Sequence, residues 1–170
     1  MTLRVYIPAT FDLLRTLAEE GQMPIRSGVG FALTPAVRDF YTEGDDEEMA
    51  YMAFLDAARA SLRLLTIGDE QRFPHRRVVI SADMEESAVA FSPEDGESVV
   101  RLSPALVTTQ NLAAIHVDDE DAEPATTAAI EVIDEADLGS EEAELTLGDC
   151  EDNFMSWYDS QELPFLVDLL

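Results

Sequence analysis

Residues 46–66 read DEEMAYMAFLDAARASLRLLT and carry the clearest periodic signal in the chain. Counted from the first aromatic residue, apolar side chains recur at i, i+3, i+4, i+7, i+11 and i+14, which is the spacing of one face of an α-helix. These side chains are Tyr51, Phe54, Leu55, Ala58, Leu62 and Leu65, and the opposite side carries Asp56, Arg59 and Arg63. Asp45 with Glu48 resembles a capping box at the start of the helix. The pattern predicts a long helix whose apolar stripe is buried in the core.

Shorter segments on both sides of this helix alternate between strand-like and helix-like patterns. Strands are predicted over 3–7, 77–82 and 114–117, with weaker candidates at 29–33, 87–91, 98–102 and 142–147. Helices are predicted over 11–20, 35–41 and 124–135, with a short one at 109–113. Thr10 and Thr34 precede the first two of these helices and are predicted to be their N-caps. A last helix is predicted to carry Phe154, Trp157 and Tyr158 on one face and to end before Pro164. This order predicts an α/β (or α+β) fold in a single domain over residues 1–170, with a mixed β-sheet and helices packed on it.

The charge of the chain is its most unusual property. The sequence holds 36 acidic residues against 10 basic ones, all of them arginine, for a net charge of −26. The last arginine is Arg101, so residues 102–170 carry acids alone. Such a surface repels phosphates, which disfavours direct nucleic-acid binding and adhesion to anionic membranes. It suits a basic partner, and it also suits a protein that is merely kept soluble by its acids.

The chain has the features of a cytoplasmic protein. Cys150 is the only cysteine, so no disulfide can form within the chain, as is usual in a reducing compartment. The first residues, MTLRVYIPAT, lack the basic and apolar regions of a signal peptide. No stretch approaches the roughly 20 apolar residues that span a membrane.

Three segments carry a resemblance to a known family. RVYIPAT at residues 4–10, IHVDDEDAEP at 115–124 and WYDSQELP at 157–164 occur in this order. In these segments the chain resembles a family of small acidic actinobacterial proteins that is known as a domain of unknown function. The resemblance implies a bacterial protein with a mixed α/β fold, and it implies no catalytic residues.

The most suggestive cluster for small-ligand chemistry follows the predicted strand 114–117. It contains His116, Asp118, Asp119 and Asp121, at the carboxyl end of a strand and just before a helix, where ligand sites form in open α/β sheets. Oxygen ligands of this kind could hold Mg²⁺ or Ca²⁺. The alternative is a solvated turn in which Asp121 or Glu123 caps the next helix, and this alternative is the one we expect.

Two further clusters are candidates for binding. Trp157, Tyr158 and Glu162 combine two aromatic rings with a carboxylate and could contact a partner, although aromatic residues at helical spacing more often pack on the core. Arg72, Arg76 and Arg77, with His75 among them, form the only basic cluster and could bind an anion. Their alternative is pairing with the protein's own acids. Cys150 is flanked by acids that raise a thiol pKa, which indicates a plain cysteine.

The sequence leaves two classes of function open. It lacks a phosphate-binding glycine loop and the GxSxG, CxxC and HExxH motifs, so the sequence disfavours an enzymatic function. The first hypothesis is an interaction or regulatory protein without catalytic activity, which docks on a basic partner surface. The second is a small enzyme or ligand-binding domain with a divalent cation, Mg²⁺ or Ca²⁺, at His116–Asp121; no other cofactor is expected. The oligomeric state is left open.

The helix over residues 46–66 generates a stability prediction. Leu62 lies in the middle of the apolar stripe, so Leu62→Ala removes buried methyl groups and leaves a cavity. We expect the free energy of unfolding to fall by about 2–5 kcal/mol, measured by urea denaturation. An unchanged unfolding curve would show that this face of the helix is not in the core.

Overall fold

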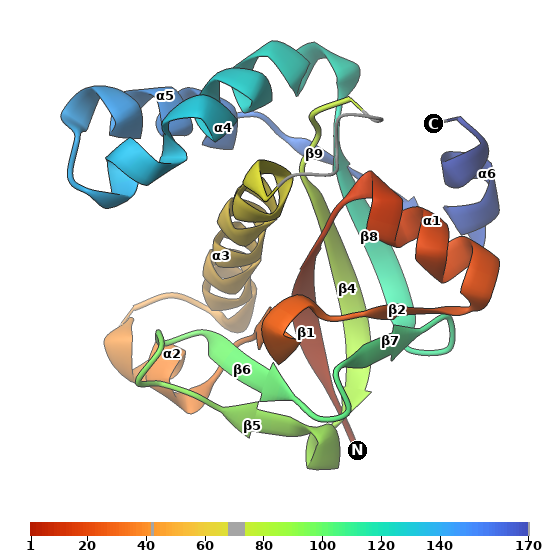
Figure 1. Ribbon diagram of the computed structural model, residues 1–170. Coiled ribbons are helices and arrows are strands. Elements are labelled where there is room, and N and C mark those ends of the chain that lie inside the picture. Colours follow the sequence, from red (N-terminus) through yellow and green to blue (C-terminus); the bar gives the residue numbers. More distant parts are fainter. Residues whose placement is uncertain (42, 68–73, 170) are drawn as a thin grey trace.

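The computed structural model describes residues 1–41, 43–67 and 74–169, and its centre is a twisted seven-stranded sheet (Figure 1). The strands lie in the order β5-β6-β3-β1-β4-β8-β9, and every neighbouring pair is antiparallel. Their bounds are β1 (Thr2–Ala9), β3 (Val29–Phe31), β4 (Val78–Glu85), β5 (Val89–Phe91), β6 (Val99–Leu102), β8 (Leu112–Asp118) and β9 (Met155–Asp159). A separate two-stranded sheet pairs β2 (Gln22–Pro24) with β7 (Leu106–Thr108).

Helices cover both faces of the large sheet, which confirms the predicted α/β class with helices packed on a sheet. The prediction of a mixed sheet is wrong, because all neighbouring strands of the described sheet run in opposite directions. They are α1 (Phe11–Glu20), α2 (Pro35–Phe40), α3 (Asp46–Thr66), α4 (Glu123–Asp137), α5 (Glu141–Glu151) and α6 (Leu163–Asp168). Alternate residues of a strand point to opposite faces. Val5 and Ile7 of β1 therefore enter the main core under α1 and α6, whereas Tyr6 points to the face that α3 covers. No helix in the described ranges is long and apolar enough to cross a membrane.

The start signals in the sequence correspond to real helix caps. The hydroxyls of Thr10 and Thr34 accept hydrogen bonds from the first turns of α1 and α2, and the Asp45 carboxylate accepts one from the Glu48 amide of α3. Each bond satisfies an amide that has no partner inside its helix. The predicted strands and helices up to residue 102 are confirmed, as are the strand at 114–117 and the helix at 124–135.

The long helix α3 is confirmed, but its buried face differs from the predicted stripe. The residues that are buried are Met49, Ala53, Ala57, Ala58, Ser61, Leu62 and Leu65. Ala53 and Ala57 have no bulk beyond Cβ, so the helix can pack closely on the sheet at these positions. Tyr51 is 46% exposed, and Phe54 and Leu55 are only half-buried. The aromatic half of the predicted stripe thus lies beside the core, where its side chains can contact a ligand.

Two predictions between residues 109 and 147 are wrong. Residues 109–111 form the turn from β7 into β8 instead of a short helix, and the Asn111 side chain closes it by accepting from the Thr108 amide. Residues 142–147 belong to α5 instead of an edge strand. The alternation of acids and apolar residues is compatible with both structures. The helix forms because Ala143, Leu147 and Cys150 together bury one face against α4.

The predicted helix through Phe154, Trp157 and Tyr158 is also wrong. Residues 155–159 are β9, which pairs along the edge of β8 and so gains backbone hydrogen bonds that the sequence alone does not reveal. Pro164 lies in the first turn of α6 instead of ending a helix before it, and its missing amide costs nothing there. The caps predicted from Asp121 or Glu123 are not made, because the N-cap of α4 is Ala122 and has no side-chain bond.

A buried ion pair ties four segments together where β4 begins. The Arg77 guanidinium donates from Nε to Asp118 Oδ2 at 2.9 Å and from Nη2 to Oδ1 at 2.7 Å. Asp118 Oδ2 also accepts from the Arg77 amide and from the Thr126 hydroxyl of α4. Arg77 Nη2 in turn donates to the Asn153 carbonyl, just before β9. Both side chains are almost completely buried, at 1% and 0% exposed.

This pair generates a double-variant prediction. Arg77→Met leaves a buried carboxylate without its cation, and we expect it to lower the free energy of unfolding by about 3–5 kcal/mol in urea denaturation. Asp118→Asn alone is expected to be similarly harmful, whereas the double variant recovers a large part of the loss because no buried charge remains. Arg4→Met removes the exposed Arg4–Asp83 pair and is the control, with an expected loss of about 0–1 kcal/mol. Additive losses in the double variant would contradict this account.

Candidate functional site

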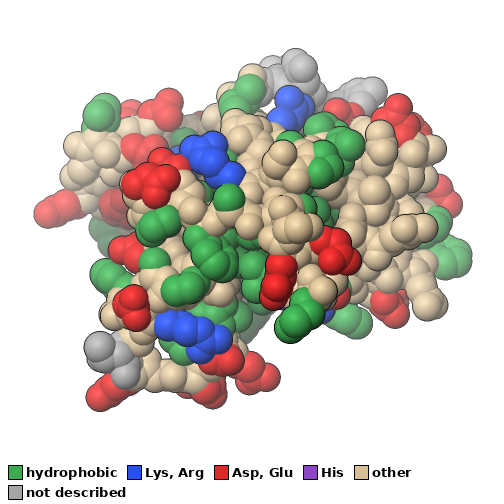
Figure 2. Space-filling view, turned by 90° about the horizontal axis from the view of Figure 1, so that it is seen from below, with side chains coloured by type: hydrophobic (Ala, Val, Ile, Leu, Met, Phe, Trp, Pro, Cys, Tyr) green, Lys and Arg blue, Asp and Glu red, His purple; other side chains and the backbone are tan. Residues whose placement is uncertain are grey.

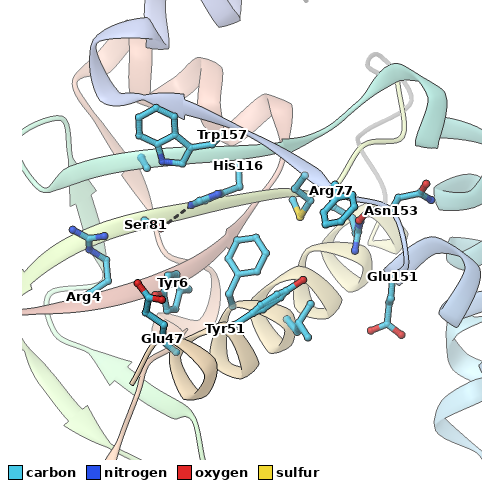
Figure 3. A pocket seen from close by; sticks show the side chains of 16 residues that line it. Arg4, Tyr6, Glu47, Tyr51, Arg77, Ser81, His116, Glu151, Asn153 and Trp157 are labelled. Carbon is cyan, nitrogen blue, oxygen red and sulfur yellow. Dashed lines mark hydrogen bonds between the residues drawn. The ribbon is translucent and has the colours of Figure 1, made fainter. Parts of the chain in front are cut away.

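A pocket of about 400 Å³ opens between α3 and the sheet face formed by β1, β4, β8 and β9 (Figure 3). Its volume falls within the range of about 300–1,000 Å³ that is usual for small-ligand sites. Tyr6, Ser81, His116 and Trp157 contribute from the four strands, and Tyr51 and Phe54 contribute from the helix. The pocket is therefore assembled from segments that are far apart in the sequence.

The register of the sheet places the floor of the pocket. Tyr6 of β1 lies opposite Ser81 of β4, and Ser81 lies opposite Ala114 of β8. His116 is two residues after Ala114 on the same face, and it lies opposite Trp157 of β9. A shift of one residue in any of these three pairings would turn the shifted side chains to the other face. The register of the strands therefore places Tyr6, Ser81, His116 and Trp157 in the same cavity.

The wall of the pocket is one face of α3. Glu47, Ala50, Tyr51, Phe54 and Leu55 line it at i, i+3, i+4, i+7 and i+8, which are neighbouring positions on a helix surface. This face is rotated from the buried one that holds Ala53 and Ala57. The helix thus uses one side for packing and the adjacent side for the pocket.

Aromatic rings dominate the interior of the pocket. Phe54 lies at the centre, with its ring 4.8 Å from the His116 ring, 5.9 Å from Tyr6 and 5.9 Å from Tyr51, measured between centroids. The contacts with His116 and Tyr6 are edge-to-face, an arrangement that aromatic quadrupoles favour. Burial also raises the pKa of the Tyr6 hydroxyl, so it stays neutral at pH 7.

The rim of the pocket exposes aromatic side chains to solvent. Trp157 is 62% exposed and Phe154 is 85% exposed, and both line the opening together with Tyr51. Large apolar side chains that gather around a cavity are typical of surfaces that contact a partner or ligand. This concentration of exposed rings distinguishes the pocket from the smaller hollows beside α6, which are lined by residues such as Leu163, Pro164 and Val167.

His116 and Ser81 form the polar centre of the floor. His116 Nε2 lies 2.8 Å from Ser81 Oγ, and burial, with a smaller contribution from Arg4, lowers the pKa of His116 from 6.5 to about 4. The imidazole is therefore neutral at pH 7. A serine–histidine pair can also serve a nucleophilic enzyme, but such an enzyme needs free amides to stabilise an oxyanion. Ser81 lies inside β4, whose backbone pairs with β1 on one side and β8 on the other.

Four charged side chains line the pocket, and they are not equally compensated. Arg4 and Arg77 are each held by a carboxylate that lies outside the lining, Asp83 and Asp118 respectively. Glu151 pairs with Arg59, but that arginine is shared with Glu144. Glu47 makes no hydrogen bond or ion pair with any described residue. The remaining charge of the pocket is therefore negative.

Comparison with protein families assigns this chain. The family model described as "Family of unknown function (DUF6912)" matches residues 3–167, nearly the whole chain. The chain belongs to this family. Membership in DUF6912 confirms the resemblance drawn from the three sequence segments, whereas the actinobacterial source stays a prediction. No curated protein and no solved structure matches the chain.

The predicted metal-binding residues do not converge in this DUF6912 protein. His116 points into the pocket and bonds Ser81, whereas both carboxylate oxygens of Asp118 are taken by Arg77. Asp119 accepts a hydrogen bond from the Ser156 hydroxyl, and Asp121 lies exposed on the next turn. Among the described residues, no three histidine, cysteine or acidic side chains are grouped as a metal site would require.

The predicted aromatic cluster is divided by the sheet. Trp157 points to the α3 face and lines the pocket, and Tyr158 points to the other face and packs on the main core. Glu162 is exposed at the start of α6 and does not line the pocket. Of these three candidates, Trp157 alone reaches the pocket. The pocket lining also includes His116, from the predicted metal site, and Arg77, from the predicted anion site.

The basic cluster is also divided. Arg76 pairs with Glu123 at 2.7 Å, Arg77 is buried against Asp118, and His75 Nδ1 lies 2.9 Å from the Thr127 hydroxyl. Pairing with the protein's own acids, the alternative to an anion site, is thus what Arg76 and Arg77 do. Arg72 lies outside the described residues. Cys150 is buried beside Thr126, and burial raises the pKa of its thiol, in agreement with a plain cysteine.

Most of the pocket residues could not be predicted from the sequence. The helical pattern predicts Tyr51 and Phe54 as core residues, and no catalytic or binding motif in the sequence includes Tyr6 or Ser81. Two signals in the sequence were informative. Tyr6 is a polar aromatic residue within the strand segment RVYIPAT, and Ser81 is a polar residue within the otherwise apolar run VVISA. Each marks a strand position whose side chain lines the pocket.

The depressed pKa of His116 predicts how stability depends on pH. In the unfolded chain His116 takes up a proton near pH 6.5, but in the folded protein only near pH 4. The unfolded state therefore binds more protons between these values, so stability falls as the pH is lowered through this window. His116→Gln remains neutral and can still reach Ser81. We expect the wild type to lose about 1–3 kcal/mol more than this variant between pH 7 and pH 4, since the ring is partly exposed. Parallel losses in urea denaturation would contradict the assignment.

Proposed function

We propose that this protein is a binding module that docks on a basic segment of a partner protein, with the α3–β9 pocket as its contact site. The observation that carries the proposal is the aromatic pocket, because three exposed rings surround it on a chain of net charge −26. Acidic surfaces accelerate and orient the approach of basic partners, and buried aromatic contacts supply most of the affinity.

The surface supports this combination of forces. Figure 2 shows hydrophobic side chains gathered in the middle of one face, with acidic side chains around them and few basic ones. A central apolar patch with a charged rim is the usual anatomy of a protein–protein contact. The exposed arginines near the pocket are engaged by the protein's own carboxylates, as Arg4 is by Asp83 and Arg38 by Asp46. They therefore offer little attraction to an acidic partner.

Binding is favoured over catalysis by the chemistry of the floor. His116 is neutral and is held by Ser81 and Phe54, and Ser81 lies within a strand that is paired on both sides. These groups can orient a ligand by hydrogen bonds. The divalent-cation hypothesis receives no comparable support, because Asp118 is committed to Arg77.

The proposal predicts saturable binding of a basic peptide through the pocket. The probe is a short peptide that alternates arginine with serine, titrated into the full chain by calorimetry at about 0.15 M NaCl, where nonspecific attraction is screened. We expect Trp157→Ser to weaken binding about tenfold or more, as for a central aromatic contact. Phe165→Ser is the matched control, since Phe165 is an aromatic residue of α6 with 72% exposure outside the pocket lining.

Two results would overturn the proposal. One is the absence of saturable binding by the basic peptide, with the heat no different from that of a peptide alternating glutamate with serine. The other is equal weakening by Trp157→Ser and Phe165→Ser, which would assign the affinity to general charge and exposed apolar surface.

A further inference from the structure

We infer that the α3–β9 pocket takes an arginine side chain of the basic partner segment, with the guanidinium against the Tyr51 and Trp157 rings and within reach of the Glu47 carboxylate. This inference rests on the proposed function and deepens it by naming the group that enters the pocket. Its basis is the juxtaposition in one cavity of aromatic rings, a carboxylate that has no partner among the described residues, and a neutral floor (Figure 3).

The rings provide the first part of the argument. Cations bind to the faces of Trp and Tyr rings within about 6 Å of the centroid, and guanidinium stacks on such faces better than ammonium because it is planar and weakly hydrated. Tyr51 and Trp157 come from opposite sides of the opening, one from α3 and the other from β9. Both are partly exposed, so a ligand can reach them without displacing core side chains.

The charge balance provides the second part. Arg4 and Arg77 could attract an anion, but Asp83 and Asp118 each occupy two donor groups of the arginine they hold. Glu47 has no partner among the described residues, and it lies at the mouth of the pocket in the first turn of α3. A guanidinium would give this carboxylate a bidentate partner.

The floor provides the third part. A protonated imidazole beside the pocket would repel a cation, but burial keeps His116 neutral at pH 7. The arginine stem needs apolar surface along its methylene groups, and Phe54 and Leu55 supply it. The pocket thus combines an apolar wall and a neutral His116 with the carboxylate of Glu47.

The test compares arginine with its neutral isostere. The probes are a serine–glycine peptide with one central arginine and the same peptide with citrulline, which has almost the same shape and no charge. Trp157 is the only tryptophan in the chain, so its fluorescence reports on the pocket directly. We expect a saturable change in emission with the arginine peptide, and binding at least about tenfold weaker with citrulline.

Matched variants separate local from general charge. Glu47→Gln is expected to weaken binding of the arginine peptide about three- to tenfold, whereas Glu48→Gln makes the same charge change in the same helical turn and leaves it unchanged. Tyr51→Ala is expected to weaken it about tenfold, against no change for its neighbour Met52→Ala, which does not line the pocket. Thermal melts establish that all four variants remain folded.

The failures of the two proposals can be told apart. Equal affinity for arginine and citrulline, or equal effects of Glu47→Gln and Glu48→Gln, would overturn the arginine site while the alternating basic peptide still binds through Trp157. If the alternating peptide itself shows no saturable binding, the proposed function fails, and the arginine site fails with it.

Discussion

The buried pair of Arg77 and Asp118 is the interaction on which the pocket side of this fold depends. It joins the start of β4 to the end of β8, and it reaches α4 through Thr126 and the segment before β9 through the Asn153 carbonyl. Burying two charges is expensive, and such a pair adds little net stability compared with apolar residues. Its contribution here is geometric, because a two-point bond between the strand ends admits one register. That register of β4 and β8 places His116 within hydrogen-bond distance of Ser81.

The packing of helix α3 on this part of the sheet forms the pocket. Ala53 and Ala57 allow the helix to lie close to the sheet, while Tyr51 and Phe54 lie on the adjacent helix face and cannot enter the same contact. The Phe54 ring instead contacts Tyr6 and His116, Tyr51 packs against Phe54, and the pocket lies open beside these rings. Small and large residues alternate along this helix, so one element both closes the core and shapes a binding surface.

The sequence predicted the elements that are determined by neighbouring residues, such as helix caps and helical periodicity. The caps at Thr10, Thr34 and Asp45 and the period of α3 could be predicted from the sequence, and the fold class followed from the order of strand-like and helix-like segments. The region after residue 137 was misread because its structure depends on distant partners. Residues 155–159 form β9 because they pair with the edge of β8. Residues 141–151 form α5 because one face of this helix packs on apolar side chains of α4. The same reason explains the site: Tyr6, Ser81, His116 and Trp157 are neighbours only once four strands are in register, and single-sequence periodicity contains no information on that register.

The acidity of the chain and the composition of the pocket act over different distances. The net charge of −26 creates a field that draws cations from solution, but this field is screened beyond about 8–10 Å at physiological salt and cannot distinguish one basic segment from another. Selectivity requires contacts at short range. The pocket supplies them with aromatic rings and one carboxylate without a described partner, and it contains no uncompensated arginine. An acidic protein that needed only solubility would have no reason to leave Trp157, Tyr51 and Phe154 exposed around a cavity, because exposed rings favour association. The concentration of these rings at the pocket therefore points to a ligand that uses both attractions, a cation carried on an apolar stem.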